Sequence, residues 1–377
     1  MKNVLIIMST NIFSGAEKVL ADYLKENTTH RFFLLTNDIS MPLLDDVAHN
    51  NDNLTLLKDK TMRVISIRKN PLSSLSYLVY NLGKIHRIVK KNDINVLYGN
   101  NTVDMVYVML YKKLFHSDIV AISHVHDIIQ RNMYHSLIKK FNSLIDAFIV
   151  TSQSGKNSFK MDVDDVGKIH VIHNGCNVEL DVKPTNIYFK CPKKRLVFVG
   201  QLCERKRVDF FIDIIKYLQG IIPNKYEGII VGPFVDGDEV YTKKIEERLK
   251  GTQDYICLKG PVKSTDLFKS FYLHADALLL TSDRDPLPTV ILEAMSLGIP
   301  VIARQVDGVT EMIEDKVTGF SWPYEASVAD VAIYIDEIFN KKYDLENIKN
   351  NAKNKLDSEF SLEWKKNRIN SLIESLE

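Results

Sequence analysis

Short apolar runs alternate with longer amphipathic stretches along most of this chain, and each run has the length of a buried strand. The runs of the first half lie at 4–8, 32–36, 64–67, 96–99, 119–123, 147–151 and 169–172. Those of the second half lie at 196–200, 228–231, 256–259, 277–281 and 301–303. Because helical patterns separate most of them, we expect parallel sheets with helices on both faces, an α/β protein.

The length of 377 residues predicts two domains, because a single core seldom serves so long a chain. The stretch 176–193 carries Pro184 and Pro192 between two strand patterns, which is typical of a linker. We therefore expect an N-terminal domain at 1–175, a C-terminal domain at 194–358 and a last helix at 359–377.

Composition favours a soluble globular protein, with 45% hydrophobic and 26% charged residues. The sequence has no run of 18 apolar residues and enters a strand pattern at its first residues, so we expect neither a signal peptide nor a transmembrane helix. Four scattered cysteines without paired spacing indicate reduced thiols, not zinc ligands or disulfides. A cytoplasmic location is predicted.

Charge is unevenly distributed along the chain. Residues 1–175 hold 21 Lys and Arg against 16 Asp and Glu, whereas the remainder holds 28 against 32. Between Lys58 and Lys91, nine basic residues accompany one acid, Asp59, within an amphipathic helical pattern. Such a surface either attracts anionic lipid head groups or is an ordinary solvated helix face. The sequence has no nucleic-acid-binding motif, so no nucleic-acid partner is expected.

The stretch 285–303 reads as loop, helix, turn and strand. Pro288 suits the first turn of the helix, and Gly298 with Pro300 ends it. A helix start offers unpaired N–H groups and a positive dipole end to an anion such as a diphosphate. Asp285 precedes the helix and Glu293 lies inside it, where a carboxylate suits sugar hydroxyls better than phosphate.

Other polar motifs follow the predicted strands. Gly15-Ala-Glu-Lys follows the first strand, His124-Val-His126-Asp127 closes another, and Arg205-Lys206-Arg207 follows the strand that ends at Gly200. Asp127 could fix an imidazole tautomer. Basic side chains in a loop after a strand can bind phosphate oxygens. The first loop lacks the Gly-x-Gly-x-x-Gly pattern, which counts against a dinucleotide dehydrogenase.

Residues 293–301, Glu-Ala-Met-Ser-Leu-Gly-Ile-Pro-Val, and a carboxylate eight positions before them resemble the retaining family-four glycosyltransferases. The resemblance implies the GT-B fold: two Rossmann-like domains facing across a cleft, with the last helix returning to the first. Asp307-Gly308 resembles a family loop, and Gly319-Phe320 a following turn. Three positions depart from the family pattern. Ser14 stands where the family has the first Gly of a Gly-Gly-Ala-Glu loop. Asp285 stands where the family has Glu, with roughly 1.5 Å less reach, and Gln201 stands where it has Arg.

The resemblance also implies roles for single residues. His126 and Asp285 would orient the donor sugar, Lys206 with Arg205 or Arg207 would bind the diphosphate, and Glu293 would hold the ribose. Spacing does not decide between the two arginines. Further contacts to the substrate are implied for Gly15 at the first loop, Gly260 at the nucleobase, and the helix start at Leu287, Pro288, Thr289 and Val290.

We therefore expect a hexose or related sugar to be transferred from a nucleotide-sugar, UDP-linked more readily than GDP-linked, to a glycan or lipid-linked acceptor. The nucleotide-sugar is a co-substrate, and no cofactor or metal is expected; Asp283-Arg-Asp285 is interpreted as a chance Asp-x-Asp. Cell-surface polysaccharide synthesis beside the inner membrane face is the expected setting. Two alternatives stay open at this point: a sugar-nucleotide epimerase of the same fold, and a catalytically silent subunit.

Overall fold

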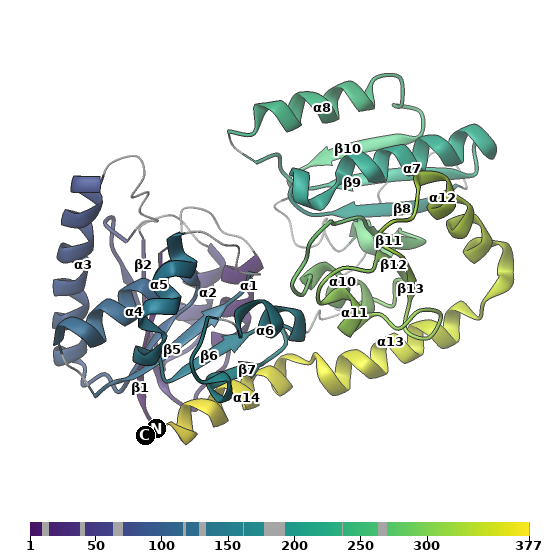
Figure 1. Cartoon of the computed structure of the whole chain (residues 1–377). Helices are drawn as coiled ribbons and strands as arrows, with labels where there is room; N and C mark the ends of the chain where they lie inside the picture. Colours follow the sequence, from purple (N-terminus) through teal and green to yellow (C-terminus); the bar gives the residue numbers. More distant parts are fainter. Residues whose placement is uncertain are drawn as a thin grey trace. The chain divides into compact units, whose positions relative to one another are not determined.

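A computed structural model of the chain describes residues 1–9, 15–37, 42–62, 71–115, 118–127, 133–160, 162–176, 193–235, 237–262 and 270–376. These residues form two compact units (Figure 1). The first unit joins Met1–Gly175 to Leu362–Glu377, and the second is Cys176–Ser361. Each unit is built on one sheet whose strands all run parallel, so the predicted α/β class is confirmed.

The sheet of the first unit has the strand order β3-β2-β1-β4-β5-β6-β7. Its strands are β1 (Asn3–Met8), β2 (Arg31–Thr36), β3 (Leu54–Lys58), β4 (Val96–Gly99), β5 (Val120–Val125), β6 (Ala147–Val150) and β7 (Ile169–Val171). Six of the seven predicted runs are confirmed, and the seventh, at 64–67, lies outside the described residues. The sequence pattern missed β3, in which Leu54 alone is buried and the other four residues are partly or fully exposed.

The sheet of the second unit has the order β10-β9-β8-β11-β12-β13. Its strands are β8 (Lys194–Val199), β9 (Tyr226–Val231), β10 (Ile256–Gly260), β11 (Ala277–Leu280), β12 (Val301–Arg304) and β13 (Phe320–Trp322). All five predicted runs are confirmed. The turn expected at Gly319-Phe320 is wrong for Phe320, which opens β13 and pairs with Ile302 in a three-residue strand that is fully buried.

Helices cover both faces of each sheet (Figure 1). In the first unit, one face carries α1 (Gly15–Leu24), α2 (Pro42–His49) and α14 (Leu362–Ser375), and the other α3 (Pro71–Lys91), α4 (Thr102–Phe115), α5 (Met133–Phe141) and α6 (Gln153–Phe159). In the second, one face carries α7 (Val208–Ile221), α8 (Glu239–Leu249) and α12 (Val328–Glu337), and the other α10 (Thr289–Ser296) and α11 (Val309–Met312). Helix α13 (Leu345–Glu359) contributes to both cores of the second unit. Strands covered on both sides are apolar throughout, which explains the uninterrupted runs.

Each sheet reverses its winding direction once. In the first unit the reversal lies between β1 and β4, and in the second between β8 and β11. Loops that leave neighbouring strands in opposite directions open a crevice at their carboxyl ends, and ligands of such sheets bind there. The two reversal points therefore mark where functional side chains are to be sought.

The last helix is part of the first unit. Near its end, Lys2 Nζ donates to the carbonyl oxygens of Ile373, at 2.9 Å, and Leu376. The Tyr23 hydroxyl donates to Asn370 Oδ1 over 2.8 Å. Lys365 is 1% exposed and donates from Nζ to the Val19 carbonyl of α1 over 3.1 Å. Burial lowers the pKa of Lys365 to about 7.

We expect Lys365→Met to stabilise the protein at pH 7 and to flatten the pH dependence of its stability. Above pH 7 native Lys365 loses its proton while the unfolded chain keeps one until about pH 10.4, so stability rises with pH by up to about 1.4 kcal/mol per unit. Urea unfolding of both proteins from pH 6 to 9 measures this. Parallel stability curves for the two proteins would contradict the assignment.

Two glycines at strand ends in the second unit nearly touch. Gly232 has φ +147°, and a Cβ atom placed on it would lie 1.8 Å from the Gly200 carbonyl oxygen. Gly200 N donates to Val231 O, and Gly232 N donates to Gly260 O. The close approach fixes the paths of the loops that follow β8 and β9.

We expect Gly232→Ala to destabilise the protein by about 2 kcal/mol or more, because the new methyl group collides with backbone that cannot rotate away. Gly220→Ala is the matched control. Gly220 lies in α7 with no atom within 4 Å of an added Cβ, so that change should stabilise the helix by about 0.5–1 kcal/mol. Chemical denaturation compares the variants, and equal effects would refute the contact.

Candidate active site

Charged side chains of the second unit gather at the reversal point of its sheet. One loop leaves β8 and includes the short 3₁₀ helix Glu204–Lys206, and the other leaves β11 and leads into α10. Because β8 and β11 are adjacent parallel strands, both loops emerge at the same edge. Asp283 N donates to Arg205 O over 2.9 Å, which ties the two loops together.

Lys206 and Asp285 form an ion pair between these loops. The Asp285 side chain is 7% exposed, and that of Lys206 is 14% exposed. Ser282 Oγ donates to Asp285 Oδ2 over 3.2 Å, and Asp307 Oδ2 accepts the Asp285 backbone N–H over 2.8 Å. The carboxylate is thus held in place by an ammonium and a hydroxyl, and a third loop fixes its backbone.

The two arginines that flank Lys206 have different surroundings. Arg207 donates to both carboxylate oxygens of Asp283 at 3.1 Å, and to Asp209 at 3.1 Å. The Arg205 side chain is 43% exposed, donates to the Arg284 carbonyl over 2.9 Å, and lies 3.9 Å from Asp285 Oδ1. The charge of Arg207 is therefore already compensated by two carboxylates. Arg205 is the arginine whose charge is more available to a ligand.

Helix α10 begins at Thr289, one residue later than expected. Pro288 is its N-cap residue, with φ −68° and ψ 115°, so the prediction that Pro288 lies in the first turn is wrong by one position. Proline has no side-chain acceptor with which to cap the N–H groups of the first turn. Gly298 has φ +68° and follows the end of the helix, as predicted.

Glu293 lies in the second turn of α10 and is 5% exposed. The Tyr272 hydroxyl donates to Glu293 Oε2 over 2.9 Å. Burial and the neighbouring Glu293 carboxylate raise the pKa of Tyr272 well above its usual value, so the hydroxyl keeps its proton as a donor. Tyr272 gave no signal in the sequence, because a tyrosine in an apolar helical pattern looks like an ordinary core residue.

The remaining predicted residues of the second unit lie near the same edge. Gly260 ends β10 with φ +65°, and its carbonyl oxygen accepts the Gly232 N–H over 2.9 Å. Leu287 is buried, and Thr289 and Val290 open α10. Arg205, Lys206 and Asp285 are thus joined by direct contacts, while Glu293 and Gly260 occupy separate positions at this edge.

The first unit holds a different set of polar groups at its own reversal point. Ser9 follows β1, Asn100 follows β4, and His126 follows β5. Ser9 N donates to Asp104 Oδ1 over 2.8 Å, and the Ser9 hydroxyl donates to the same oxygen. Asp104 is fully buried in the first turn of α4, and burial raises its pKa well above the usual range. Sequence analysis missed Ser9, Asn100 and Asp104, although each lies within a few residues of a predicted strand end.

His126 is a neutral side chain at this edge. Its Nε2 lies 3.4 Å from Asn100 Oδ1, and its ring lies 3.9 Å from that of His124. Burial, followed by the charge of Lys365, lowers the pKa of His126 below its usual range. Among the described contacts, no hydrogen bond joins the side chains of His126 and Asp127, and a role for Asp127 in fixing an imidazole tautomer stays a prediction. Gly15 begins α1, next to residues outside the described part.

Within the described ranges, no group of three or more His, Cys, Asp or Glu side chains is arranged to hold a metal ion. Asp283 and Asp285 are engaged separately: the first pairs with Arg207 and Arg304, and the second with Lys206. None of the helices in the same ranges is long and apolar enough to cross a membrane.

Comparison with known proteins gives two family matches. The family model described as "Glycosyltransferase Family 4" matches residues 15–180, and the one described as "Glycosyl transferases group 1" matches residues 186–355. A curated relative, an uncharacterised glycosyltransferase of Methanocaldococcus jannaschii, is 27% identical over 204 residues. That match covers 52% of this chain and 50% of the relative, so the chain spans half the length of the relative.

Solved structures show the same fold at low sequence identity. HepE of Anabaena in complex with UDP and glucose has a TM-score of 0.80 and 18% identity, covering 100% of both chains. The lipopolysaccharide outer core galactosyltransferase WaaB has a TM-score of 0.70 and 18% identity, again over 100% of both chains. The two Rossmann-like sheets are those of the GT-B fold. With family matches that span both of its units, this chain belongs to the group 1 glycosyltransferases, of the family-four type.

Proposed function

We propose that this chain is a retaining glycosyltransferase that moves a sugar from a nucleotide-sugar, UDP-linked more readily than GDP-linked, to a glycan or lipid-linked acceptor. The Lys206–Asp285 ion pair at the reversal point of the second sheet carries the proposal. In this pair, a cation that can bind phosphate lies next to a carboxylate that can accept hydrogen bonds from sugar hydroxyls. Helix α10 begins four residues after Asp285. The structural neighbour HepE, solved with UDP and glucose, supports a UDP-sugar donor.

The diphosphate would be bound by charge and by helix N–H groups. Arg205 would supply the positive charge that the family pattern places at Gln201, because its side chain is 43% exposed and its guanidinium lies 3.9 Å from Asp285 Oδ1, a carboxylate that Lys206 contacts more closely. The N–H groups that open α10 add a partial positive charge. Lys206, Arg205 and this helix start would stabilise the leaving diphosphate in place of a metal.

Asp285 would change partners during the reaction. Without a ligand its carboxylate is neutralised by Lys206, and the arriving diphosphate competes for that ammonium. Exchange of Lys206 from carboxylate to phosphate would free Asp285 to accept hydrogen bonds from the donor sugar. The shorter side chain compared with Glu suits this dual role, since it keeps the carboxylate within reach of Lys206.

Glu293 and His126 complete the proposed donor contacts. Glu293, oriented by Tyr272, would accept hydrogen bonds from the ribose. His126, neutral at pH 7, would orient the sugar through a hydrogen bond and not through charge. The reaction would proceed by departure and attack on one face of the sugar, with a diphosphate oxygen taking the proton of the acceptor hydroxyl.

We expect the purified protein to bind one of UDP, GDP or ADP in calorimetry, with UDP preferred and with EDTA present throughout. Glu293→Ala should weaken that binding roughly tenfold or more, because a carboxylate that accepts ribose hydroxyls is lost. Glu227→Ala is the matched control, since Glu227 pairs with Arg195 in the same unit, away from the proposed contacts.

The outcomes separate the possible functions. Binding of none of the three nucleotides would refute the transferase proposal and favour a silent subunit. Nucleotide release from a nucleotide-sugar without any acceptor would favour an epimerase. Binding that appears only when a divalent metal replaces EDTA would contradict the metal-independent mechanism.

We also propose that the first unit associates peripherally with an anionic membrane surface, as suits a lipid-linked acceptor in cell-surface polysaccharide synthesis. Helix α3 buries one stripe through Leu82, Ile85 and Val89. Its exposed side carries Tyr77, Tyr80, Arg87 and Lys91, which follow one another at spacings of three, seven and four. Val79, on the same helix, is 62% exposed. Aromatic and basic side chains on one solvent-facing helix surface suit a bilayer interface.

Not every basic residue of this helix is available for lipid. Lys84 forms an ion pair with Asp59, and burial lowers its pKa. Arg68 and Lys69, two of the nine basic residues between Lys58 and Lys91, lie outside the described residues. Arg87, Lys90 and Lys91 are exposed and carry the proposed attraction.

We expect the triple variant Arg87→Gln, Lys90→Gln, Lys91→Gln to bind vesicles containing 30% anionic lipid more than tenfold more weakly. About 1 kcal/mol is lost per charge near the surface. Lys243→Gln, Lys250→Gln, Lys353→Gln removes three exposed charges from the second unit and should leave binding unchanged. Vesicle co-sedimentation measures both. Binding by the unchanged protein that is absent, or insensitive to salt, would contradict the proposal.

A further inference from the structure

The turn that carries Lys206 ends in an unusual backbone conformation. Arg207 has φ 52° and ψ 45°, in the left-handed region that residues with side chains seldom adopt. This residue links the 3₁₀ helix Glu204–Lys206 to α7, where it is the N-cap residue without a side-chain cap. A turn of this kind persists only where surrounding contacts impose it.

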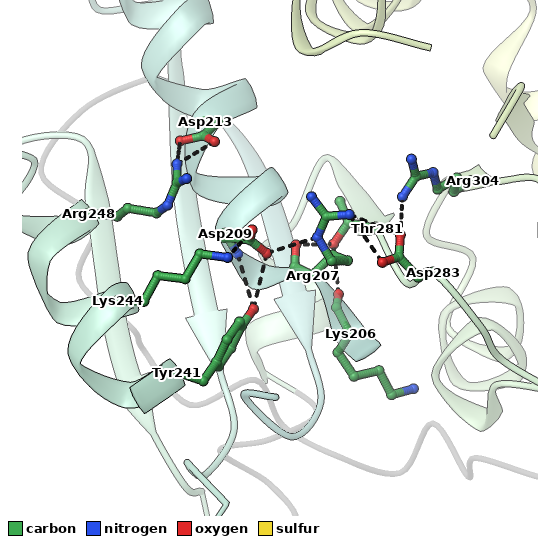
Figure 2. Close-up of polar contacts among 10 residues, drawn as sticks. All are labelled: Lys206, Arg207, Asp209, Asp213, Tyr241, Lys244, Arg248, Thr281, Asp283 and Arg304. Atoms are coloured by element: carbon green, nitrogen blue, oxygen red, sulfur yellow. Dashed lines mark hydrogen bonds and ion pairs between the residues drawn. The ribbon is translucent and has the colours of Figure 1, made fainter. Parts of the chain in front are cut away.

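A chain of alternating charges supplies such contacts (Figure 2). Arg207 lies between two carboxylates, Asp209 at 3.1 Å and Asp283 at 3.1 Å. Asp209 also accepts from Lys244 over 3.0 Å and from the Tyr241 hydroxyl over 3.1 Å. The hydrogen bonds and charges of Asp283 and Asp209 outweigh the effect of burial and raise the pKa of Arg207.

Asp283 and Arg304, at the other end of this series of ion pairs, are also held by several contacts. Asp283 pairs with Arg304, which is 6% exposed. Arg304 donates to the Tyr324 carbonyl from Nε over 3.0 Å and from Nη2 over 2.6 Å. Its guanidinium lies 5.2 Å from the Phe210 ring centroid and 4.2 Å from that of Tyr324. Asp283 is therefore held from both sides and can in turn hold Arg207.

The side chain of Thr281 holds the same turn by hydrogen bonds to backbone carbonyl groups. This fully buried residue follows β11, and its Oγ1 donates to Lys206 O at 3.1 Å and to Arg207 O at 3.0 Å. Figure 2 shows the side chain of Lys206 directed away from these contacts. The backbone of Lys206 is thus held independently of the partner its ammonium takes.

We propose that Thr281 and the Arg207–Asp283 pair are positioning residues that set the Lys206 ammonium for a nucleoside diphosphate. The inference rests on the proposed function and extends it. Lys206 would exchange Asp285 for a phosphate oxygen without movement of its backbone, because the turn is anchored by groups that bind no ligand. Arg207 serves as part of this anchor and not as a phosphate ligand.

The test is calorimetric binding of UDP to the full chain and to variants of these residues. Thr281→Val removes the hydroxyl without changing charge or size, and should raise the Kd for UDP roughly three- to tenfold. Thr281→Ser keeps the hydroxyl and should bind within about twofold of the unchanged protein. A merely structural role of Thr281 would lower the melting temperature and leave the Kd unmoved.

Asp213→Asn is the control for a lost ion pair. Asp213 pairs with Arg248 between α7 and α8 without touching the turn (Figure 2), so its loss should leave the Kd for UDP unchanged. Asp283→Asn provides an independent variant that removes one of the two carboxylate partners of Arg207 and leaves Asp209 as the other, and it should weaken UDP binding. Stronger binding by Asp283→Asn would show that Arg207 is itself a phosphate ligand, and would overturn the proposal.

The outcomes for this inference differ from those for the proposed function. An unchanged protein that binds none of the nucleotides refutes the function, and the inference falls with it. An unchanged protein that binds UDP, with Thr281→Val and Asp283→Asn binding equally well, refutes only the positioning role.

Discussion

The ion pair between Lys206 and Asp285 is the interaction on which the second unit's site depends. Its partners come from loops that leave two adjacent parallel strands in opposite directions, so the charges meet only because the sheet reverses its winding between β8 and β11. A carboxylate this deeply buried would be costly without a cation, and the cation would be poorly placed without the carboxylate. The pair therefore holds the two loops together.

Charge compensation also distinguishes the two arginines that flank Lys206. Arg207 adopts a left-handed backbone and has its charge balanced by Asp209 and Asp283, whereas Arg205 remains exposed beside the pair. Two arginines that are close in sequence thus differ in exposure and in charge compensation because their surroundings differ. Spacing along the sequence could not distinguish them, because the deciding partner Asp283 lies 76 positions away from Arg207.

Much of the fold followed from the sequence because buried parallel strands are apolar on both faces. The run 4–8 became β1, and 301–303 became β12. The failures have a common physical cause: β3 and β13 are strands of five and three residues at the edges of their sheets, with too few consecutive apolar positions to stand out. In the site, motif residues such as Lys206 were visible, but Tyr272 and Thr281 were not. Their roles depend on tertiary contacts with residues that are distant in sequence.

The polar side chains at the strand ends differ in charge state between the two units. In the second unit the edge holds ionised groups, with Lys206, Asp285 and Arg205 in contact. In the first unit the described edge holds His126, whose pKa is lowered to about 3, and Asp104, whose pKa is raised well above its usual range. Burial is the main cause of both shifts, and both favour the neutral form of the side chain. Neutral donors and acceptors discriminate hydroxyl groups by direction, whereas ionised groups bind a diphosphate by charge. The strand ends of the two sheets are therefore suited to different kinds of ligand group.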